Sequence, residues 1–208
     1  EALASLNEEL MAVPEGFTIH RKLERGRERR KAMFASATER SIDWASAEEL
    51  ALAAALADGV PVRFTGEDVE RGTFSHRHAV YRDAVSGEKH IPLQRLSKAK
   101  ASFEIRNSPL SEYACVGFEL GYNLQQPNTL VLWEAQYGDF INGAQMMLDE
   151  FVLSARAKWG QEPSMVLLLP HGYEGQGPDH ASARPERFLQ LAADINMRVV
   201  NCTTAAQY

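Results

Sequence analysis

The chain has 208 residues, of which 45% are apolar and 24% are charged, and its formal net charge is −6. This length allows one generous globular domain, or one domain with an extension. The acidic balance argues against nucleic acid as the main partner, because binding to phosphates requires clustered Lys and Arg.

Cysteine usage and hydropathy indicate where the protein works. The sequence contains two cysteines, Cys115 and Cys202, which disfavours a disulfide framework and favours a reducing compartment. No apolar run approaches the ~18 residues that a membrane span needs, and no signal peptide is evident. We therefore expect no membrane association and a cytoplasmic protein, or a protein of the mitochondrial matrix in a eukaryote.

Residues 1–40 combine mixed charge with helical patterning that is interrupted at Pro14-Glu15-Gly16. We predict an N-terminal helical extension or linker here, followed by one domain over residues 41–208. Seven basic residues lie between Arg21 and Lys31. They are expected to form a solvated helix face or a salt-bridge strip between subunits, and a partner-binding surface on a non-catalytic module is the alternative.

Strand-like and helix-like segments alternate along the rest of the chain. A capping-box-like start at Ser46–Glu49 predicts a helix through Leu50–Ala57 that stops at Asp58-Gly59. The predicted strands are Val60–Thr65, Ala101–Arg106, Thr129–Glu134, Met165–Leu169 and Met197–Cys202. The predicted helices between them are Glu112–Leu124, Gly143–Trp159 and Pro185–Ile195. This alternation predicts an α/β fold with a doubly wound, mostly parallel sheet, and the final residues suggest that the domain is truncated at its C-terminal end.

Two glycine-rich polar runs follow predicted strands. One is His171–His180, after the run that ends at Pro170, and the other is Arg71–His78, downstream of the first strand. Ligands of open α/β sheets bind outside the carboxyl ends of the strands, and glycines let the backbone approach a ligand closely. A histidine in such a loop can donate a proton or contact an anion, or it can simply tie the loop to its own backbone.

Two further segments place chemical groups at strand ends. Ser111 can cap the helix that starts at Glu112, and an acidic residue in a first turn often does no more than complement the helix dipole. Here that helix start is expected at the carboxyl edge of the sheet, where a ligand would lie. The segment Trp133–Phe140 offers Tyr137 and Phe140 as an aromatic platform, although core packing is the simpler role for each ring.

His76 and His78 are two residues apart, so in a strand they would share one face. They lack a carboxylate or cysteine partner at the usual ligand spacing, and we predict no metal there. A weaker alternative function is a metal-assisted hydrolase that uses His76, His78, His171 and His180.

Four runs of the sequence together resemble a known family. They are Gly66–His78 (GEDVERGTFSHRH), Leu110–Tyr122, Trp133–Phe140 (WEAQYGDF) and His171–Arg184. From about Ile42 onward, the chain resembles the transketolase-like pyrimidine-binding domain of thiamine-diphosphate-dependent 2-oxoglutarate dehydrogenases, the decarboxylating first component of that complex. The resemblance implies a homodimeric oxidoreductase of the tricarboxylic acid cycle. Such an enzyme oxidatively decarboxylates 2-oxoglutarate and passes the succinyl group to a lipoyl acyltransferase, the succinyltransferase component.

The resemblance also implies roles for single residues. Glu112 falls where the family keeps the glutamate that hydrogen-bonds the aminopyrimidine ring of the cofactor, a role that is both cofactor-binding and catalytic. Tyr137 is expected to stack on that ring, with Phe140 beside it. His180 matches a catalytic histidine that faces the substrate. Weaker substrate-facing candidates are His171, His76 and Glu67.

The sequence departs from the family pattern in two respects. Many relatives carry glutamine where this chain has Glu67, and an ionised carboxylate accepts hydrogen bonds but donates none. The motif that holds the cofactor diphosphate and Mg²⁺ is also missing, so the resemblance implies that a domain absent from this chain binds both. These residues alone are therefore expected to bind the cofactor weakly and to be inactive.

Overall fold

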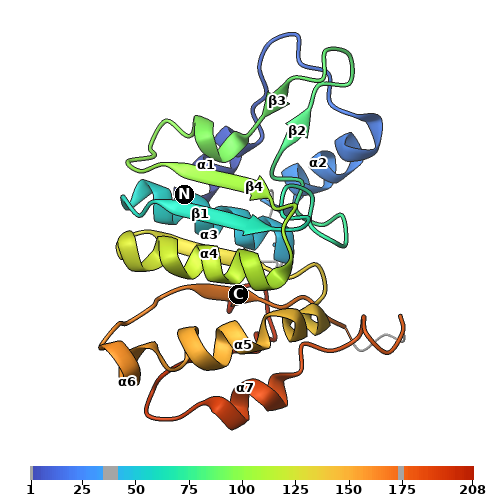
Figure 1. Cartoon of the computed structure of the whole chain (residues 1–208). Coiled ribbons are helices and arrows are strands. Elements are labelled where there is room, and N and C mark those ends of the chain that lie inside the picture. Colours follow the sequence, from blue (N-terminus) through green and yellow to red (C-terminus); the bar gives the residue numbers. More distant parts are fainter. Residues whose placement is uncertain (1, 35–41, 173–175) are drawn as a thin grey trace. The chain divides into compact units, whose positions relative to one another are not determined.

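The computed structural model describes residues 2–34, 42–172 and 176–208, and the part of the glycine-rich run at 173–175 lies outside them. The chain divides into two compact units (Figure 1). The first comprises Glu1–Val60, Phe74–Phe103 and Cys202–Tyr208, and the second comprises Pro61–Thr73 and Glu104–Asn201. Within the described ranges, no helix is long and apolar enough to cross a membrane.

The first unit is mainly helical. Its helices are α1 (Ala2–Leu10), α2 (Arg21–Met33) and α3 (Trp44–Ala57), with a 3₁₀ turn, η1 (Pro92–Arg95). Strands β2 (Tyr81–Arg82) and β3 (Lys89–His90) form a short antiparallel pair. Helix α1 packs against α3 and η1, and Leu6 and Leu10 are buried in this contact. The N-terminal residues thus supply apolar side chains to the interior of the unit.

Helix α3 begins earlier than the sequence pattern indicates. The carboxylate of Asp43 accepts a hydrogen bond from the backbone N–H of Ser46 at 2.8 Å, so Asp43 is the N-cap and the helix starts at Trp44. The prediction of a start at Ser46 was wrong because aspartate caps a helix as well as serine does. Glu48 consequently lies one turn inside α3, where it is buried and paired with Arg77.

The basic stretch on α2 divides between solvent and interior. Arg21, Lys22, Arg25, Arg29 and Lys31 are exposed, as expected for a solvated helix face. The other two basic residues of the stretch turn inward. Arg27 donates to the carbonyl of Met11 at 2.7 Å, and Arg30 pairs with Glu49 on α3. For these two arginines the prediction was wrong, because their guanidinium groups bond to other parts of the same unit rather than to solvent.

The second unit is built on a parallel sheet. Within the described residues, its four strands are β1 (Val62–Gly66), β4 (Phe103–Asn107), β5 (Leu130–Glu134) and β6 (Val166–Leu168), in the spatial order β4-β1-β5-β6. In the ladders, Val62 pairs with Leu130 and Leu132 pairs with Val166, and both pairings are parallel. The predicted α/β class with a mostly parallel sheet is confirmed.

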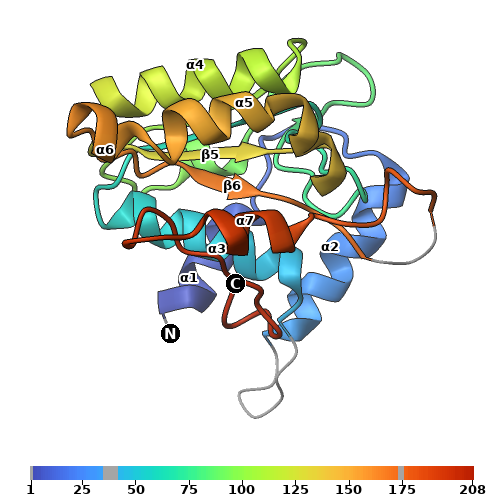
Figure 2. The same ribbon diagram turned by 60° about the horizontal axis from the view of Figure 1, so that its bottom comes forward.

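Helices lie on both faces of this sheet. Figure 2 shows α4 (Glu112–Gln125) and α5 (Gln145–Met147) over one face and α7 (Pro185–Leu191) over the other. A core cluster joins the layers through Val116 of α4, Trp133 of β5 and Phe188 of α7. Because both faces are covered, β5 is buried from Val131 to Glu134, as its apolar sequence predicts.

The predicted fifth strand, Met197–Cys202, does not form. The segment has no ladder partner, and Val199 and Val200 are 38% and 74% exposed. An apolar run becomes a strand only when a neighbouring strand accepts its hydrogen bonds, and β6 is the last strand of the sheet in the described ranges.

Two predicted helices differ from the observed ones. The predicted helix Gly143–Trp159 is broken into the 3₁₀ segment η2 (Gly138–Ala144), α5, the π-helical turn η3 (Leu148–Val152) and α6 (Ala155–Trp159). The hydroxyl of Ser154 donates to the carbonyl of Asp149, a local bond that competes with regular helix bonding. The other helix, α7, ends at Leu191 rather than at Ile195, because the backbone of Ala192 is extended, with φ −70° and ψ 113°. Asp194 and Ile195 then have positive φ angles, which no α-helix contains.

Candidate functional site

A cleft of about 390 Å³ opens in the second unit, where β1 and β5 end. Its lining residues are Glu67, Glu112, Gln136, Asp139, Phe140, Asn142, Gly143, Asp179 and Arg184. The chain passes from β1 to β4 on one side and then returns past β1 to β5 on the other side. The boundary between β1 and β5 is therefore the topological switch point, the place where open α/β sheets bind ligands.

Glu112 enters this cleft from the first turn of α4. Ser111 is the N-cap, with extended backbone angles, and Glu112 is the first helical residue and half-buried. A Cβ atom placed on Gly143 would lie 3.4 Å from Oε2 of Glu112, so the carboxylate lies beside Gly143 of η2. The partial positive charge of the helix N-terminus lies next to this side chain.

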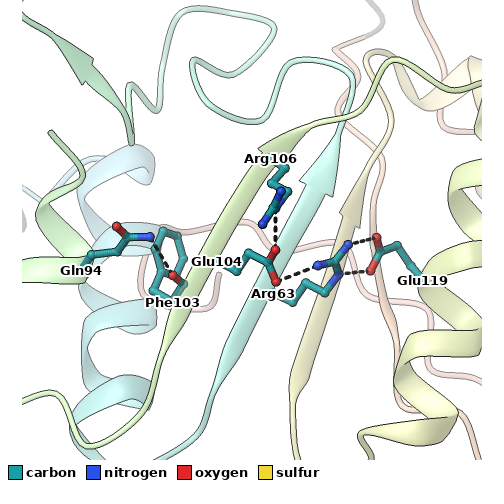
Figure 3. A network of polar contacts seen from close by, with 6 residues as sticks. All are labelled: Arg63, Gln94, Phe103, Glu104, Arg106 and Glu119. Atoms are coloured by element: carbon teal, nitrogen blue, oxygen red, sulfur yellow. Dashed lines mark hydrogen bonds and ion pairs between the residues drawn. The ribbon is translucent and has the colours of Figure 1, made fainter. Parts of the chain in front are cut away.

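Helix α4 is anchored to the sheet by Arg63 of β1 (Figure 3). The guanidinium donates to both carboxylate oxygens of Glu119 on α4, at 2.7 and 2.9 Å, and to Glu104 of β4 at 2.7 Å. The hydrogen bonds with Glu119 raise the pKa of Arg63 further, so its charge persists at every working pH. This bridge fixes the orientation of α4 and therefore the place of Glu112.

The turn that precedes α4 is held by Cys115. Its Sγ lies 2.7 Å from the Ser108 hydroxyl and 3.4 Å from the carbonyl oxygen of Leu110. Cys115 is buried, and burial raises the pKa of its thiol, so the thiol stays protonated and unreactive near neutral pH. The residue serves to pin the turn that delivers Glu112.

Glu67 faces the same cleft from the end of β1. The preceding Gly66 has φ 153°, and a Cβ atom there would lie only 2.2 Å from the carbonyl oxygen of Glu134, so a larger residue would push β1 and β5 apart. Burial, followed by the negative charges of Glu112 and Asp68, raises the pKa of Glu67. The carboxyl groups of Glu67 and Glu112 are thus electrostatically coupled within one cleft.

A group of three rings lies beside the cleft, and one of them, Phe140, lines it. The ring of His180 meets those of Tyr137 and Phe140 edge-on, with centroid distances of 4.5 and 5.2 Å. Nδ1 of His180 lies 2.6 Å from a carboxylate oxygen of Asp179, and this contact lowers the pKa of Asp179. The hydroxyl of Tyr137 donates to the side chain of Gln176 at 3.2 Å.

The structure brings most of the predicted site residues together. Glu67, Glu112 and Phe140 line the cleft, and Tyr137 and His180 pack beside Phe140. His171 is half-buried in the loop after β6 and is not among the described lining residues. His76 belongs to the first unit, where its ring lies 6.2 Å from that of Phe74.

Several lining residues were not singled out from the sequence. Asp139, Asn142 and Gly143 come from η2, directly after β5, and Asp179 and Arg184 come from the loop after β6. The signal was present, because all of them follow strands whose carboxyl ends meet at one edge. Polar residues in both loops could have been nominated on that ground alone.

The metal-hydrolase alternative finds no support. In the described part of the chain, no group of three or more His, Cys, Asp or Glu side chains is arranged to hold a metal ion. The expected common face of His76 and His78 is also missing, because this segment is not a strand and His78 has φ 46°.

Comparisons with known proteins agree with the geometry. Residues 40–208 match the family described as transketolase, pyrimidine binding domain. The chain is 57% identical, over its full length, to the 2-oxoglutarate dehydrogenase E1 component of Geobacillus kaustophilus (strain HTA426), and it covers 22% of that protein. It is 56% identical to the 2-oxoglutarate dehydrogenase E1 component of Bacillus mycoides (strain KBAB4), over all 208 residues of this chain and 22% of that protein. The identity to the E1 component of Oceanobacillus iheyensis (strain DSM 14371) is also 56%, over 99% of this chain and 21% of that protein.

The chain thus spans about a fifth of the length of the curated relatives that it matches. The match over residues 40–208 contains the cleft, its carboxylates and the group of three rings. The chain belongs to the transketolase pyrimidine-binding domain family.

Proposed function

We propose that the cleft binds the aminopyrimidine ring of thiamine diphosphate, as part of a protein that oxidatively decarboxylates 2-oxoglutarate. Family membership and the names of the relatives support this proposal. The observation that carries it is the position of Glu112, a carboxylate at a helix start on a cleft at the switch point of the sheet.

The lining residues fit an aminopyrimidine ring. Glu112 supplies an oxygen that can form a hydrogen bond with a ring nitrogen, and Phe140 supplies an apolar ring surface against which a flat heterocycle can pack. The neighbouring Glu67 has a raised pKa, so the cleft combines one carboxyl group that readily holds a proton with one at the positive end of a helix.

In the proposed function, Glu112 shares a proton with the ring nitrogen and orients the ring against Phe140. Asp179 holds Nδ1 of His180, which leaves Nε2 as the nitrogen that would exchange a proton with the substrate. When bound, thiamine diphosphate supplies an electron sink for the electron pair that departing CO₂ leaves behind. Closing the cleft around these groups would exclude water and strengthen their interactions.

The same lining does not suit the diphosphate. Its charged members are the acidic Glu67, Glu112, Asp139 and Asp179 and the basic Arg184. A diphosphate needs cations, so we propose that another part of the longer protein, in a homodimer, holds the diphosphate and Mg²⁺. The succinyl group would then pass to a lipoyl acyltransferase of the same complex. The division into an extension at 1–40 and a domain at 41–208, and the cytoplasmic location, stay predictions.

The proposal is tested by replacing Glu112 in the full-length protein. Glu112→Ala should nearly abolish the release of CO₂ from 2-oxoglutarate at saturating thiamine diphosphate, because no other group would fix the protonation state of the ring. The melting temperature should change little, since Glu112 is half-buried and its side chain takes part in no hydrogen bond among the described residues.

The matched control is Glu186→Ala, which removes an exposed carboxylate from the first turn of α7, outside the cleft. Its CO₂ release should equal that of the unmodified protein. Near-normal CO₂ release from Glu112→Ala, or a wild-type rate that does not depend on thiamine diphosphate, would rule out the proposed role.

A further inference from the structure

Asp139 is a buried carboxylate within the run Trp133–Phe140, and neither the sequence analysis nor the proposed chemistry gives it a role. It is the second residue of η2 and is 3% exposed. Its Oδ2 accepts a hydrogen bond from the backbone N–H of Ser182 at 2.9 Å. Its Oδ1 lies 3.9 Å from Nη2 of Arg184 and has no hydrogen-bond partner among the described residues. A buried charge with so few partners is costly, which calls for a reason at this position.

Both contacts of Asp139 are with the segment that follows His180. Ser182 and Arg184 lie two and four residues beyond the histidine, and they are 43 and 45 residues from Asp139 along the chain. The hydroxyl of Ser182 in turn accepts from the backbone N–H of Arg184 at 2.9 Å. Arg184 has φ 51°, in the left-handed region, where a residue other than glycine needs such outside support.

Close packing supplements these polar contacts. A Cβ atom on Gly138 would lie 2.8 Å from Cα of Ala183 and 3.2 Å from the carbonyl oxygen of Leu169. The backbone of η2 therefore touches the backbone of the segment directly, at the residue between Ser182 and Arg184. Tyr137 and Phe140 lie two residues before and one residue after Asp139 in the sequence, and both rings pack against the ring of His180.

From these contacts we infer that Asp139 is a positioning residue, which fixes the segment 180–184 against η2 and thereby holds the His180 ring between Tyr137 and Phe140. Asp139 itself does not touch the imidazole in any described contact. It acts through the backbone of Ser182 and the charge of Arg184. This inference rests on the proposed function in so far as His180 is taken to act on the substrate.

The test compares Asp139→Ala with Asp139→Asn in the full-length protein. The alanine variant loses both contacts, whereas asparagine keeps an oxygen that can accept from Ser182 but loses the charge that faces Arg184. A shift of a catalytic group by about 1 Å can lower a rate on the order of 100-fold, so kcat for CO₂ release from 2-oxoglutarate should fall by that order in Asp139→Ala. Asp139→Asn should restore most of it.

The pH profile separates positioning from a merely structural role. In Asp139→Ala the pH profile of kcat should shift, because the contacts of the His180 ring with Asp179 and with its aromatic neighbours would loosen. The affinity for thiamine diphosphate should be retained. The control is Asp149→Ala on η3, a carboxylate outside the cleft that accepts from Gln145. It should leave both kcat and the profile unchanged.

An unchanged kcat and pH profile in Asp139→Ala would overturn the inference. A fall in kcat that is accompanied by a lower melting temperature but by no shift of the pH profile would overturn it as well, because it would indicate a merely structural role. Should Asp139→Ala fail to fold, Asp139→Asn decides by the same criteria. The proposed function fails in a different way, because the unmodified protein would then show no CO₂ release that depends on thiamine diphosphate.

Discussion

At the scale of single residues, the two carboxyl groups of the cleft are held in different ways. Glu112 is held in the first turn of α4 beside Gly143, whereas Glu67 is exposed and follows Gly66, where β1 and β5 approach closely. Their coupling is visible in the raised pKa of Glu67, to which burial contributes most and Glu112 next.

This raised pKa predicts a pH dependence of stability. The folded protein binds a proton at Glu67 more tightly than the unfolded chain, whose ordinary value is 4.5. The free energy of unfolding therefore falls as pH rises from 4.5 through the raised pKa. Glu67→Gln should remove this fall, so that its melting temperature declines less than that of the unmodified protein between about pH 4 and pH 7. The difference should be modest because solvent screens an exposed group.

Glu186→Gln serves as the control, since this carboxylate is exposed on α7 and lies outside the cleft. It should reproduce the slope of the unmodified protein. Equal slopes for all three proteins would show that Glu67 does not experience the charge of Glu112.

Some site residues could be predicted from the sequence and others could not. Glu112 and Phe140 follow from motifs placed at strand ends and Glu67 from the resemblance to a family, and the structure puts the three in one cleft. The sequence does not single out Asp139, because its contacts are with Ser182 and Arg184, which lie 43 and 45 residues away along the chain. No local sequence pattern predicts such contacts. Roles that depend on packing between distant loops become visible only in three dimensions.

At the scale of elements, the attachment of α4 to the sheet determines where Glu112 lies in the cleft. Arg63 of β1 bridges Glu119 of α4 and Glu104 of β4, and its guanidinium also lies 4.6 Å from the ring centre of Tyr122. Arginine is suited to this place because its planar fork can bind a carboxylate through two bonds and stack on a ring.

Removing this bridge should destabilise the second unit strongly. Arg63→Met leaves Glu119, which is 3% exposed, as an uncompensated buried charge, and the expected loss is about 3–5 kcal/mol in the free energy of unfolding. Urea unfolding measures it. Arg106→Gln is the matched control, because Arg106 contacts the same Glu104 with a side chain that is 70% exposed, and its loss should stay below about 1 kcal/mol. Equal losses would show that the bridge does not anchor α4.

Two glycines of the same unit should respond in opposite directions to alanine. Gly66→Ala would place a methyl group 2.2 Å from a backbone oxygen and should cost at least about 1–3 kcal/mol. Gly121→Ala in α4 meets no atom within 4 Å and should stabilise by about 0.5–1 kcal/mol, because glycine weakens a helix interior. Thermal denaturation compares the two, and a stable Gly66→Ala protein would contradict the close approach of β1 and β5.

The elements themselves follow from the sequence where local signals are strong. Helix α4 and strands β1, β4, β5 and β6 lie within two residues of their predicted starts, because apolar runs and a clear cap mark them. The prediction of a strand at Met197–Cys202 was wrong because a strand forms only beside another strand, and the residues of the segment do not determine whether one lies there. The prediction of one continuous helix at Gly143–Trp159 was wrong because residues between η2 and α6 also pack in the core cluster with Trp133 and Phe188, and such contacts are not visible in the local sequence.

At the scale of the whole molecule, the chain corresponds to about a fifth of each relative that it matches. Its cleft offers a surface for a heterocycle and an acidic lining, with Arg184 as the basic group among the described lining residues. Under the proposed function, the diphosphate of the cofactor would therefore be held elsewhere in the longer protein or by a second copy.

This incompleteness predicts weak binding by the isolated chain. Calorimetric titration of residues 1–208 with thiamine diphosphate and Mg²⁺ should give much weaker binding than the full-length protein, because the lining carboxylates repel the diphosphate. Turnover of 2-oxoglutarate by the isolated chain should be absent. Equal affinities would mean that the 208 residues contain the diphosphate site.

The most direct test of the account is an experimental structure of the full-length protein with bound thiamine diphosphate. We expect a carboxylate oxygen of Glu112 at hydrogen-bond distance, about 2.6–3.2 Å, from a nitrogen of the aminopyrimidine ring, with Phe140 packed against that ring. A ring bound away from the cleft, with Glu112 turned toward solvent, would contradict the account.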